Sequence, residues 1–337
     1  MPLKDVTVKI QIKKAARLTG LGKPALLAAL AGPSSYSNYS EPEQIAEIFG
    51  EDSIAHKIAT TLLKQGDSSP ETMGIITYDP NATDDTPKTA AKALQQHFDE
   101  DFYFVVADTQ AVADVKAIAD VVEGEGIKMF ATTITKLEDA ESLQLYKYER
   151  TFAAYHETAG EYVAEAWVGG HGSKEVGSIT WMNKKLVGIT PQAFSVAKLT
   201  DIEILNMQTF VTKSGHNVMS EGKTLSGEYI DVVHSKDWLI VNGANAIQEQ
   251  LIANDKVAYT DKGIALLASS LDNVLLAGVA QDMISVTDNI PDYAITTLSR
   301  AQSNAADRAA RIYKGLGFSF QLAGAIHKVP VKGEMII

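Results

Sequence analysis

The residues of this chain that come closest to a chemical motif are Gly169, Gly170, His171 and Gly172. Glycine-rich loops can cradle phosphate groups, because their backbone N–H groups approach the ligand closely. A dinucleotide-binding loop follows a strand and opens a helix, whereas this stretch follows a helix-like segment and precedes SKEVGSITW, which has the pattern of a strand. The context favours a tight connection. An α/β enzyme or nucleotide-binding protein that uses residues 169–172 stays open as the alternative function.

The histidines and carboxylates form no pattern typical of catalysis or metal binding. The seven histidines are scattered, without an HExxH motif or another metal-ligand spacing, and there is no G-x-S-x-G motif. The acidic groups at 84–85 and 99–101 fall at expected helix ends, where solvated carboxylates are common. The absence of cysteine excludes disulfides and thiolate nucleophiles. We therefore predict no catalytic residue, no cofactor and no metal site.

Helices and strands alternate from residue 41 to about residue 160. The strand-like runs are MGIITYDP, FYFVVADT, IKMFATTI and RTFAAYHE. The helices between them are expected at about 51–65, from the cap Thr86 with Pro87 to about Phe98, and at about 110–123 and 137–147. Strands that alternate with helices in this way require a parallel sheet covered on both faces.

The flanking regions are less regular. Residues 15–40 are expected to be irregular with a short helix at about 25–31. After the glycine-containing stretch we expect a strand at about 178–187, a helix over 196–207 and a hairpin in SGHNVMSEGKTLSG. Long helices are then expected at about 229–253 and from the cap Thr260 or Asp261, and a short helix in AADRAARIYKGL precedes a terminal strand.

Charge is unevenly distributed along the chain, whose formal net charge is −12. Residues 41–145 hold 21 Asp and Glu against 7 Lys, whereas residues 300–337 hold 6 basic against 2 acidic residues. The acidic total argues against a nucleic-acid partner, because binding to phosphates needs clustered Lys and Arg. The N-terminus lacks the apolar centre of a signal peptide, and no apolar run of about 20 residues is evident. We expect a soluble protein made in the cytosol, with no membrane partner.

Both ends of the chain have the pattern of half-buried strands. In DVTVKIQIKK, residues 5–14, apolar and polar side chains alternate, and AGAIHKVPVKGEMII, residues 323–337, is also strand-like. The two ends could pair with each other or with the chain's own sheet. Pairing within the chain is the simpler of the two interpretations, and pairing with a neighbouring copy is the alternative.

Several ordered blocks of the C-terminal half are similar to one family. SGEYIDVVHSKDWL (226–239), KVAYTDKGIALL (256–267) and AADRAARIYKGLGFSFQLAGAIHKVPVKG (305–333) resemble the tail-sheath proteins of contractile phage tails and tailocins. AEAWVGGHGSKEVGSITWMNKKLVGITP (164–191) resembles the family's glycine-containing loop followed by a strand. The resemblance covers residues 160–337, and the N-terminal half only in general layout.

The resemblance implies a non-enzymatic structural protein that stacks as six-fold rings around a tail tube and contracts. The implied fold is α/β, or α+β overall: an outer α/β domain with a parallel-type sheet and an inner, tube-proximal α+β domain, with strand arms at both termini. The implied bounds are 1–20 for the N-terminal arm, 21–195 for the outer domain, 196–325 for the inner domain and 326–337 for the C-terminal arm.

The arms of such proteins add strands to a neighbour's sheet. The implied inter-subunit residues are Val6, Val8, Ile10, Ile12, Ile326, Val329, Val331, Met335 and Ile337, and the tube-facing candidates are Arg308, Arg311 and Lys314. The implied partners are further copies of the chain, a tail tube protein, and baseplate and tail terminator proteins. The implied location is the contractile tail of a virion assembled in the host cytoplasm.

Overall fold

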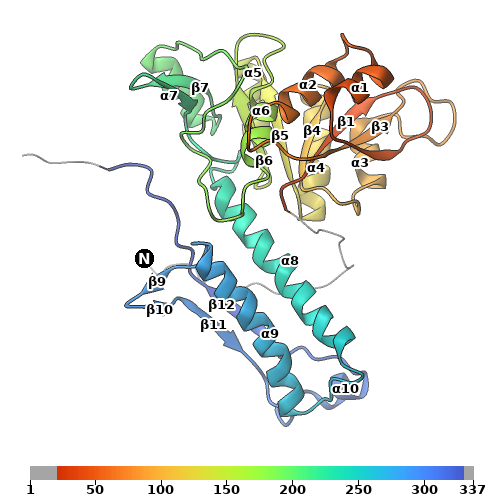
Figure 1. Cartoon of the computed structure of the whole chain (residues 1–337), viewed down its shortest axis with the longest axis vertical. Coiled ribbons are helices and arrows are strands. Elements are labelled where there is room, and N and C mark those ends of the chain that lie inside the picture. The colour runs from red at the N-terminus through yellow and green to blue at the C-terminus, as the bar shows by residue number, and fades with distance from the viewer. Residues whose placement is uncertain (1–20, 330–337) are drawn as a thin grey trace, which may run out of the picture.

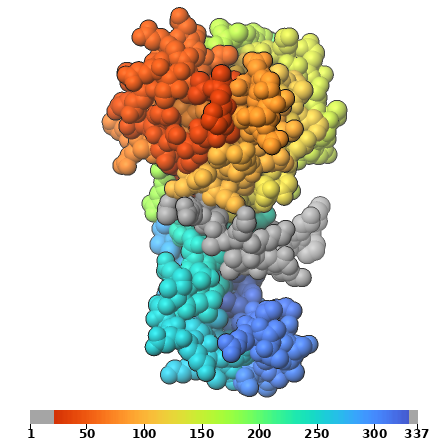
Figure 2. Space-filling model, turned by 90° about the vertical axis from the view of Figure 1, so that its right-hand side faces the viewer, coloured from red at the N-terminus to blue at the C-terminus, as the bar shows by residue number. Residues whose placement is uncertain are grey.

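The computed structural model describes residues 21–329, which form two lobes (Figure 1). We call them the sheet lobe, residues 21–229, and the stalk lobe, residues 254–322. Helix α8, Ile230–Ala253, belongs to both, because its start packs against the edge of the sheet lobe and the rest of its length forms one side of the stalk lobe (Figure 1). Figure 2 shows the red-to-green sheet lobe above the cyan and blue stalk lobe.

The sheet lobe is built on a six-stranded sheet with the strand order β2-β3-β1-β4-β5-β6. Every neighbouring pair is parallel except β2 and β3, which are antiparallel. The parallel sheet that the alternating pattern predicts is therefore confirmed. The strands are β1 Pro24–Ala29, β2 Tyr36–Tyr39, β3 Met73–Tyr78, β4 Phe104–Ala107, β5 Met129–Ile134 and β6 Thr151–Tyr155.

Strand β1 corrects the expected helix at about 25–31. Its run PALLAA has apolar side chains in every position, which suits a helix buried all round or a central parallel strand equally well. It lies between β3 and β4, so both of its faces are buried: Leu26 faces one core cluster and Leu27 the other. Pro24 opens the strand, a position where a missing N–H is tolerated.

Six helices cover the two faces of this sheet. Helices α1, α2 and α6 supply buried side chains to the core on one face, and α3, α4 and α5 to the core on the other. Helix α3 begins later than expected: its cap is Thr89, because the carbonyl of Pro87 accepts a hydrogen bond from Asp79 N in the loop after β3. The helices are α1 Pro42–Phe49, α2 Ile54–Leu63, α3 Ala90–Gln96, α4 Val112–Glu125, α5 Leu137–Gln144 and α6 Val163–His171.

The next elements lie against the end of the sheet at β6. Helix α7, Val196–Ile204, and the hairpin of β7, Phe210–Lys213, and β8, His216–Met219, agree with the expected helix and hairpin. Backbone bonds from Tyr155 N to Gln208 O, 2.6 Å, and from Leu225 N to Thr151 O, 2.8 Å, fix them to β6. These elements therefore pack on the sheet lobe, although the predicted boundary at 195/196 assigns them to the inner domain. The domain boundaries stay a prediction.

Residues 178–187 do not form the expected strand. Asn183 has a left-handed φ of 57°, which interrupts an extended chain. The segment touches β8 through only two backbone bonds that the structure gives, from Asn183 N to Met219 O and from Met219 N to Lys184 O.

The stalk lobe is a helix pair covered by small sheets. Helix α9, Asp261–Ala280, runs back along α8 and is capped by Thr260, whose hydroxyl accepts a hydrogen bond from Gly263 N (Figure 1). Both long helices are confirmed. The remaining elements are β9 Val286–Thr287, β10 Ile290–Pro291, β11 Tyr293–Thr296, α10 Ala305–Ala309 and β12 Gly317–Phe320.

Candidate functional site

The joint between the two lobes is a buried ion pair. Asp237, in α8, is 1% exposed and accepts hydrogen bonds from both terminal nitrogens of Arg150, at 2.6 and 2.9 Å. Tyr103 O–H donates a third bond to the same carboxylate, at 2.7 Å. Burial alone would lower the pKa of Arg150, but its bonds to the Asp237 carboxylate raise it above its ordinary value. The guanidinium of Arg150 therefore stays charged, and its two bonds to Asp237 fix α8 to the residues that lead into β6.

His234 completes this joint one helical turn earlier. Its ring stacks on Tyr103 with the centroids 4.7 Å apart, and its Nε2 lies 2.5 Å from the carbonyl oxygen of Leu21. Burial lowers the pKa of His234 to about 4, so the ring is neutral at neutral pH and its Nε2–H donates to that carbonyl. The start of the described chain is thereby attached to α8.

A second link joins the lobes where the chain returns from β12. The segment 323–329, which we call the strap, ends on the sheet lobe. His327 Nδ1 lies 2.7 Å from Glu221 Oε1 and its Nε2 lies 2.7 Å from Thr180 Oγ1. Its ring meets the edge of Tyr229 at a centroid distance of 4.9 Å. Sequence reasoning missed this contact, because its members are far apart in the chain and belong to no motif.

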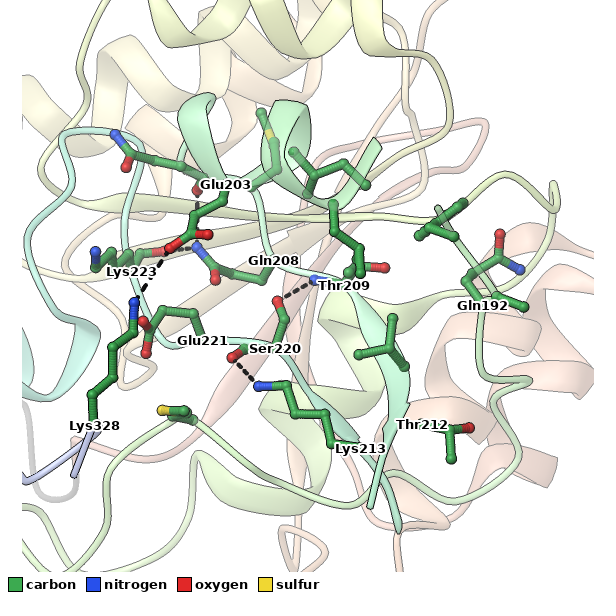
Figure 3. A pocket seen from close by; sticks show the side chains of 18 residues that line it. Gln192, Glu203, Gln208, Thr209, Thr212, Lys213, Ser220, Glu221, Lys223 and Lys328 are labelled. Atoms are coloured by element: carbon green, nitrogen blue, oxygen red, sulfur yellow. Dashed lines mark hydrogen bonds and ion pairs between the residues drawn. The ribbon is translucent and has the colours of Figure 1, made fainter. Parts of the chain in front are cut away.

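A pocket of about 420 Å³ lies beside the strap, between α7 and the hairpin β7–β8 (Figure 3). Its charged side chains are engaged within the chain: Lys213 Nζ donates to Ser220 O at 2.6 Å, and Lys328 Nζ lies 3.6 Å from Glu203. Gln208 and Thr209 each keep one buried oxygen without a hydrogen-bond partner in the described chain. The polar groups of Lys213 and Ser220 thus bond to backbone atoms, since Ser220 Oγ also accepts a hydrogen bond from Thr209 N at 3.0 Å.

The glycine-rich stretch is not a loop. Gly169 and Gly170 lie inside α6, where a side chain on Gly169 would meet the backbone of Leu62 in α2, with Cβ 2.3 Å from its carbonyl oxygen. The glycine therefore permits a close helix contact. His171 ends α6 with Nε2 3.0 Å from Lys185 O, and burial lowers its pKa to about 4. The nucleotide-binding alternative loses its structural basis, because no backbone N–H cradle is present at 169–172.

The small sheet of β11 and β12 is open at both edges among the described residues. The two strands pair antiparallel, with Tyr293 opposite Phe320 and Ile295 opposite Phe318. One face is fixed to α9, because Tyr293 O–H donates to Asp272 at 2.8 Å. Strands with free edges offer backbone N–H and C=O groups to another strand.

Most of the predicted arm residues lie outside the described residues: Val6, Val8, Ile10, Ile12, Val331, Met335 and Ile337. The two that are described, Ile326 and Val329, belong to no strand and are 86% and 73% exposed. The expected strand at 323–337 is therefore absent from its described part, residues 323–329, which forms the strap instead.

The three basic candidates differ in their surroundings. Arg308 is half-buried and donates to the carbonyl oxygens of Arg300, at 3.1 Å, and Ser303. Lys314 lies 2.7 Å from Asp307. Arg311 is exposed, and within residues 21–329 the structure gives its guanidinium no hydrogen bond or ion pair.

Two further findings concern metals and membranes. No cluster of three or more His, Asp or Glu side chains with the geometry of a metal site occurs in the described part of the chain. Helix α9 is long and apolar enough to cross a bilayer by length and composition, which corrects the expectation that no such run exists. A single helix of this kind does not establish a membrane span, because α9 packs on α8 and β11 and core helices meet the same criterion.

No protein-family model and no curated protein matches the sequence. Several solved structures, by contrast, are similar to the structure of this chain. A chain of the six-fold symmetrised anti-feeding prophage baseplate is 11% identical with a TM-score of 0.70, covering 100% of both chains. A chain of the contracted helical sheath of the anti-feeding prophage is 10% identical with a TM-score of 0.69, covering 95% of both. A sheath tail protein from Desulfitobacterium hafniense is 12% identical with a TM-score of 0.59, covering 86% of this chain and 93% of that one. The chain therefore has the contractile-sheath fold, as its sequence blocks suggested.

Proposed function

We propose that this chain is the subunit of a contractile sheath. Copies stack as six-fold rings around a tail tube and pass from an extended to a contracted lattice. The observation that carries the proposal is the likeness along 95% of both chains to a contracted helical sheath subunit, which extends through both lobes and is not limited to the sheet lobe. A layered α/β sheet alone would be shared with many unrelated enzymes.

The proposed assembly contact is strand addition. The free edges of β11 and β12 are the receiving sites, and the arms of neighbouring copies supply the strands: residues 1–20 and, beyond the strap, residues 330–337. Main-chain hydrogen bonds give such contacts their strength, and alternate side chains such as Val6 and Val8 or Val331 and Met335 give them register. These contacts can persist while the lobes of neighbouring copies slide and rotate.

The remaining proposed contacts follow from position and charge. The stalk lobe faces the tube, with Arg311 and Lys314 as the most accessible of the three basic candidates. The sheet lobe, which carries most of the chain's acidic residues, faces outward. The baseplate and tail terminator close the two ends of the stack. The particle is the contractile tail of a virion, or a DNA-free tailocin, assembled in the host cytoplasm.

Contraction in this proposal uses no nucleotide or cofactor. The extended lattice is metastable, and the contracted lattice gains contact between subunits. The chain acts as a structural protein, and no catalytic role is proposed for it.

Electron microscopy of the purified full-length protein tests the proposal. We expect rings or long helical tubes. A variant that lacks residues 330–337 keeps the whole strap and should remain folded, with an unchanged thermal transition, but should form no tubes. A second variant carries a Gly- and Ser-rich segment of equal length in place of 330–337, and it should also fail. A wild-type protein that stays monomeric at every concentration tested would overturn the proposal.

A further inference from the structure

The strap has one firm attachment at each end and little between them. At the stalk lobe, Leu322 forms a bridge with Ile284, and Ala323 N donates to Met283 O at 3.0 Å. Gly324 then turns the chain with a φ of 65°. Ile326 is 86% exposed, so its side chain holds the segment to neither lobe. The side chain of the next residue, His327, is largely covered by the sheet lobe.

His327 is attached more firmly than a surface contact requires. Its side chain is only 9% exposed and that of Glu221 12%, so water competes little for their bond. Both ring nitrogens are engaged at 2.7 Å: Nδ1–H donates to Glu221, and Nε2 pairs with the hydroxyl of Thr180. The neighbouring pair of Lys328 and Glu203 is exposed and 3.6 Å apart, so it adds little. His327 is therefore the anchor of the strap.

The surface that receives His327 is held together by backbone contacts of the sheet lobe. Gly222, next to Glu221, lies so close to Trp181, next to Thr180, that an added Cβ would be 2.7 Å from the Cβ of Trp181. Ile230 N also donates to Gly222 O at 3.0 Å, which holds the start of α8 at the same point. Thr180, Glu221 and Tyr229 are thus positioned independently of the strap. Figure 3 shows Lys328 beside this surface, with its ammonium group directed at Glu203.

We propose that Thr180, Glu221 and Tyr229 form a docking site for the chain's own strap, with His327 as the positioning residue that fixes the start of the C-terminal arm to the sheet lobe. The described chain therefore ends at the sheet lobe, although the strand that precedes the strap, β12, belongs to the stalk lobe. The docked strap thus joins the lobes in addition to α8 and to the close contact of Gly177 with Met283, where an added Cβ would lie 2.4 Å from Met283 Cγ. The role of this site in assembly rests on the proposed function, whereas the docking itself does not.

The docking is tested by limited trypsin digestion of the unassembled full-length protein, followed by mass spectrometry of the Lys328–Val329 bond. His327→Ala removes both hydrogen bonds and should make cleavage at this bond about tenfold faster, because cleavage follows the population of the released strap. Thr180→Val should give an intermediate increase. The matched control Ile326→Ala, at the exposed neighbouring position, should cleave like the wild type.

Two results would overturn the docking: a His327→Ala rate within twofold of the wild-type rate, or a parallel increase at tryptic sites throughout the chain, which would indicate general unfolding. Microscopy then tests the role in assembly. If wild-type tubes form, His327→Ala should need at least several times more protein to form them, and equal assembly would refute the positioning role. If the wild type forms no tubes, the proposed function fails, while the cleavage result still decides whether the strap docks.

Discussion

Arg150 and Asp237 are 87 positions apart in the sequence, yet they form a bidentate ion pair between the sheet lobe and α8, the helix common to both lobes. Arg150 comes directly before β6, and Asp237 lies in the buried half of α8. A helix that emerged from the sheet lobe through apolar contacts alone could slide or rotate about its axis. The paired geometry of guanidinium and carboxylate fixes both its rotation and its position.

The substitution Asp237→Asn should lower the free energy of unfolding by about 3–5 kcal/mol, because the buried charge of Arg150 then lacks a counter-charge. Urea denaturation followed by circular dichroism measures the change. The control is Glu43→Gln in the exposed pair with Lys64, where Oε1 and Nζ are 3.0 Å apart and we expect little or no loss, because solvent screens the pair. Equal losses in the two variants would contradict the role of the pair.

The buried carboxyl of Glu165 should make stability depend on pH. Burial raises its pKa to about 7, and Thr133 O–H donates to it at 2.6 Å. The folded state therefore holds this proton more tightly than the unfolded state. The contribution of Glu165 to the free energy of unfolding is fully present below the unfolded pKa of 4.5. It is lost as pH rises through the folded pKa of about 7, and the loss amounts to roughly 3 kcal/mol.

Glu165→Gln isolates that effect, since it keeps the volume and cannot ionise. Between pH 5 and pH 8, the unfolding free energy of the wild type should fall relative to that of the variant. Comparison with the variant is needed because His171 and His234 act in the opposite sense: burial lowers each pKa to about 4, so their contribution is lost as pH falls through that value. A difference that stays constant with pH would show that Glu165 is not buried as described.

The sequence predicted the layered sheet well because alternation of strands and helices is a local pattern. It failed at β1, since PALLAA is apolar in every position and the choice between helix and strand depends on the neighbours β3 and β4. It failed at 178–187 because the left-handed Asn183 is visible only in three dimensions. In both places tertiary contacts decided the structure.

The candidate site was less predictable than the fold. The anchor His327 is an ordinary histidine in the sequence, and its partners Thr180 and Glu221 are 147 and 106 positions away. No local pattern connects them. The arm residues, by contrast, were proposed from alternation and resemblance, and only Ile326 and Val329 fall among the described residues.

Charge reversal at two basic residues near α10 should have different effects. Arg311→Glu should leave the thermal transition unchanged, because the exposed guanidinium makes no hydrogen bond or ion pair within residues 21–329. The same substitution should weaken co-sedimentation with tail tubes. Arg308→Glu should instead destabilise the stalk lobe locally, because its bonds to the carbonyls of Arg300 and Ser303 are lost. If Arg311→Glu binds tubes as well as the wild type, Arg311 does not face the tube.

The glycine pair in α6 allows a matched comparison. Gly169→Ala should destabilise the sheet lobe by about 1–3 kcal/mol, because the new Cβ would lie 2.3 Å from Leu62 O and 2.8 Å from Leu62 Cα, so α2 must move. Gly170→Ala meets nothing closer than Gln65 Cβ at 3.6 Å and should be neutral or stabilising by up to about 1 kcal/mol through helix propensity.

Thermal unfolding of the two single variants, with and without added nucleotide, distinguishes helix packing from ligand binding. Packing predicts that only Gly169→Ala lowers the melting temperature and that nucleotide changes neither transition. A phosphate-binding loop predicts stabilisation of the wild type by nucleotide, abolished by both substitutions. Because the two glycines are adjacent in one helix and differ only in their distance from α2, equal effects of the two substitutions on stability would refute the packing explanation.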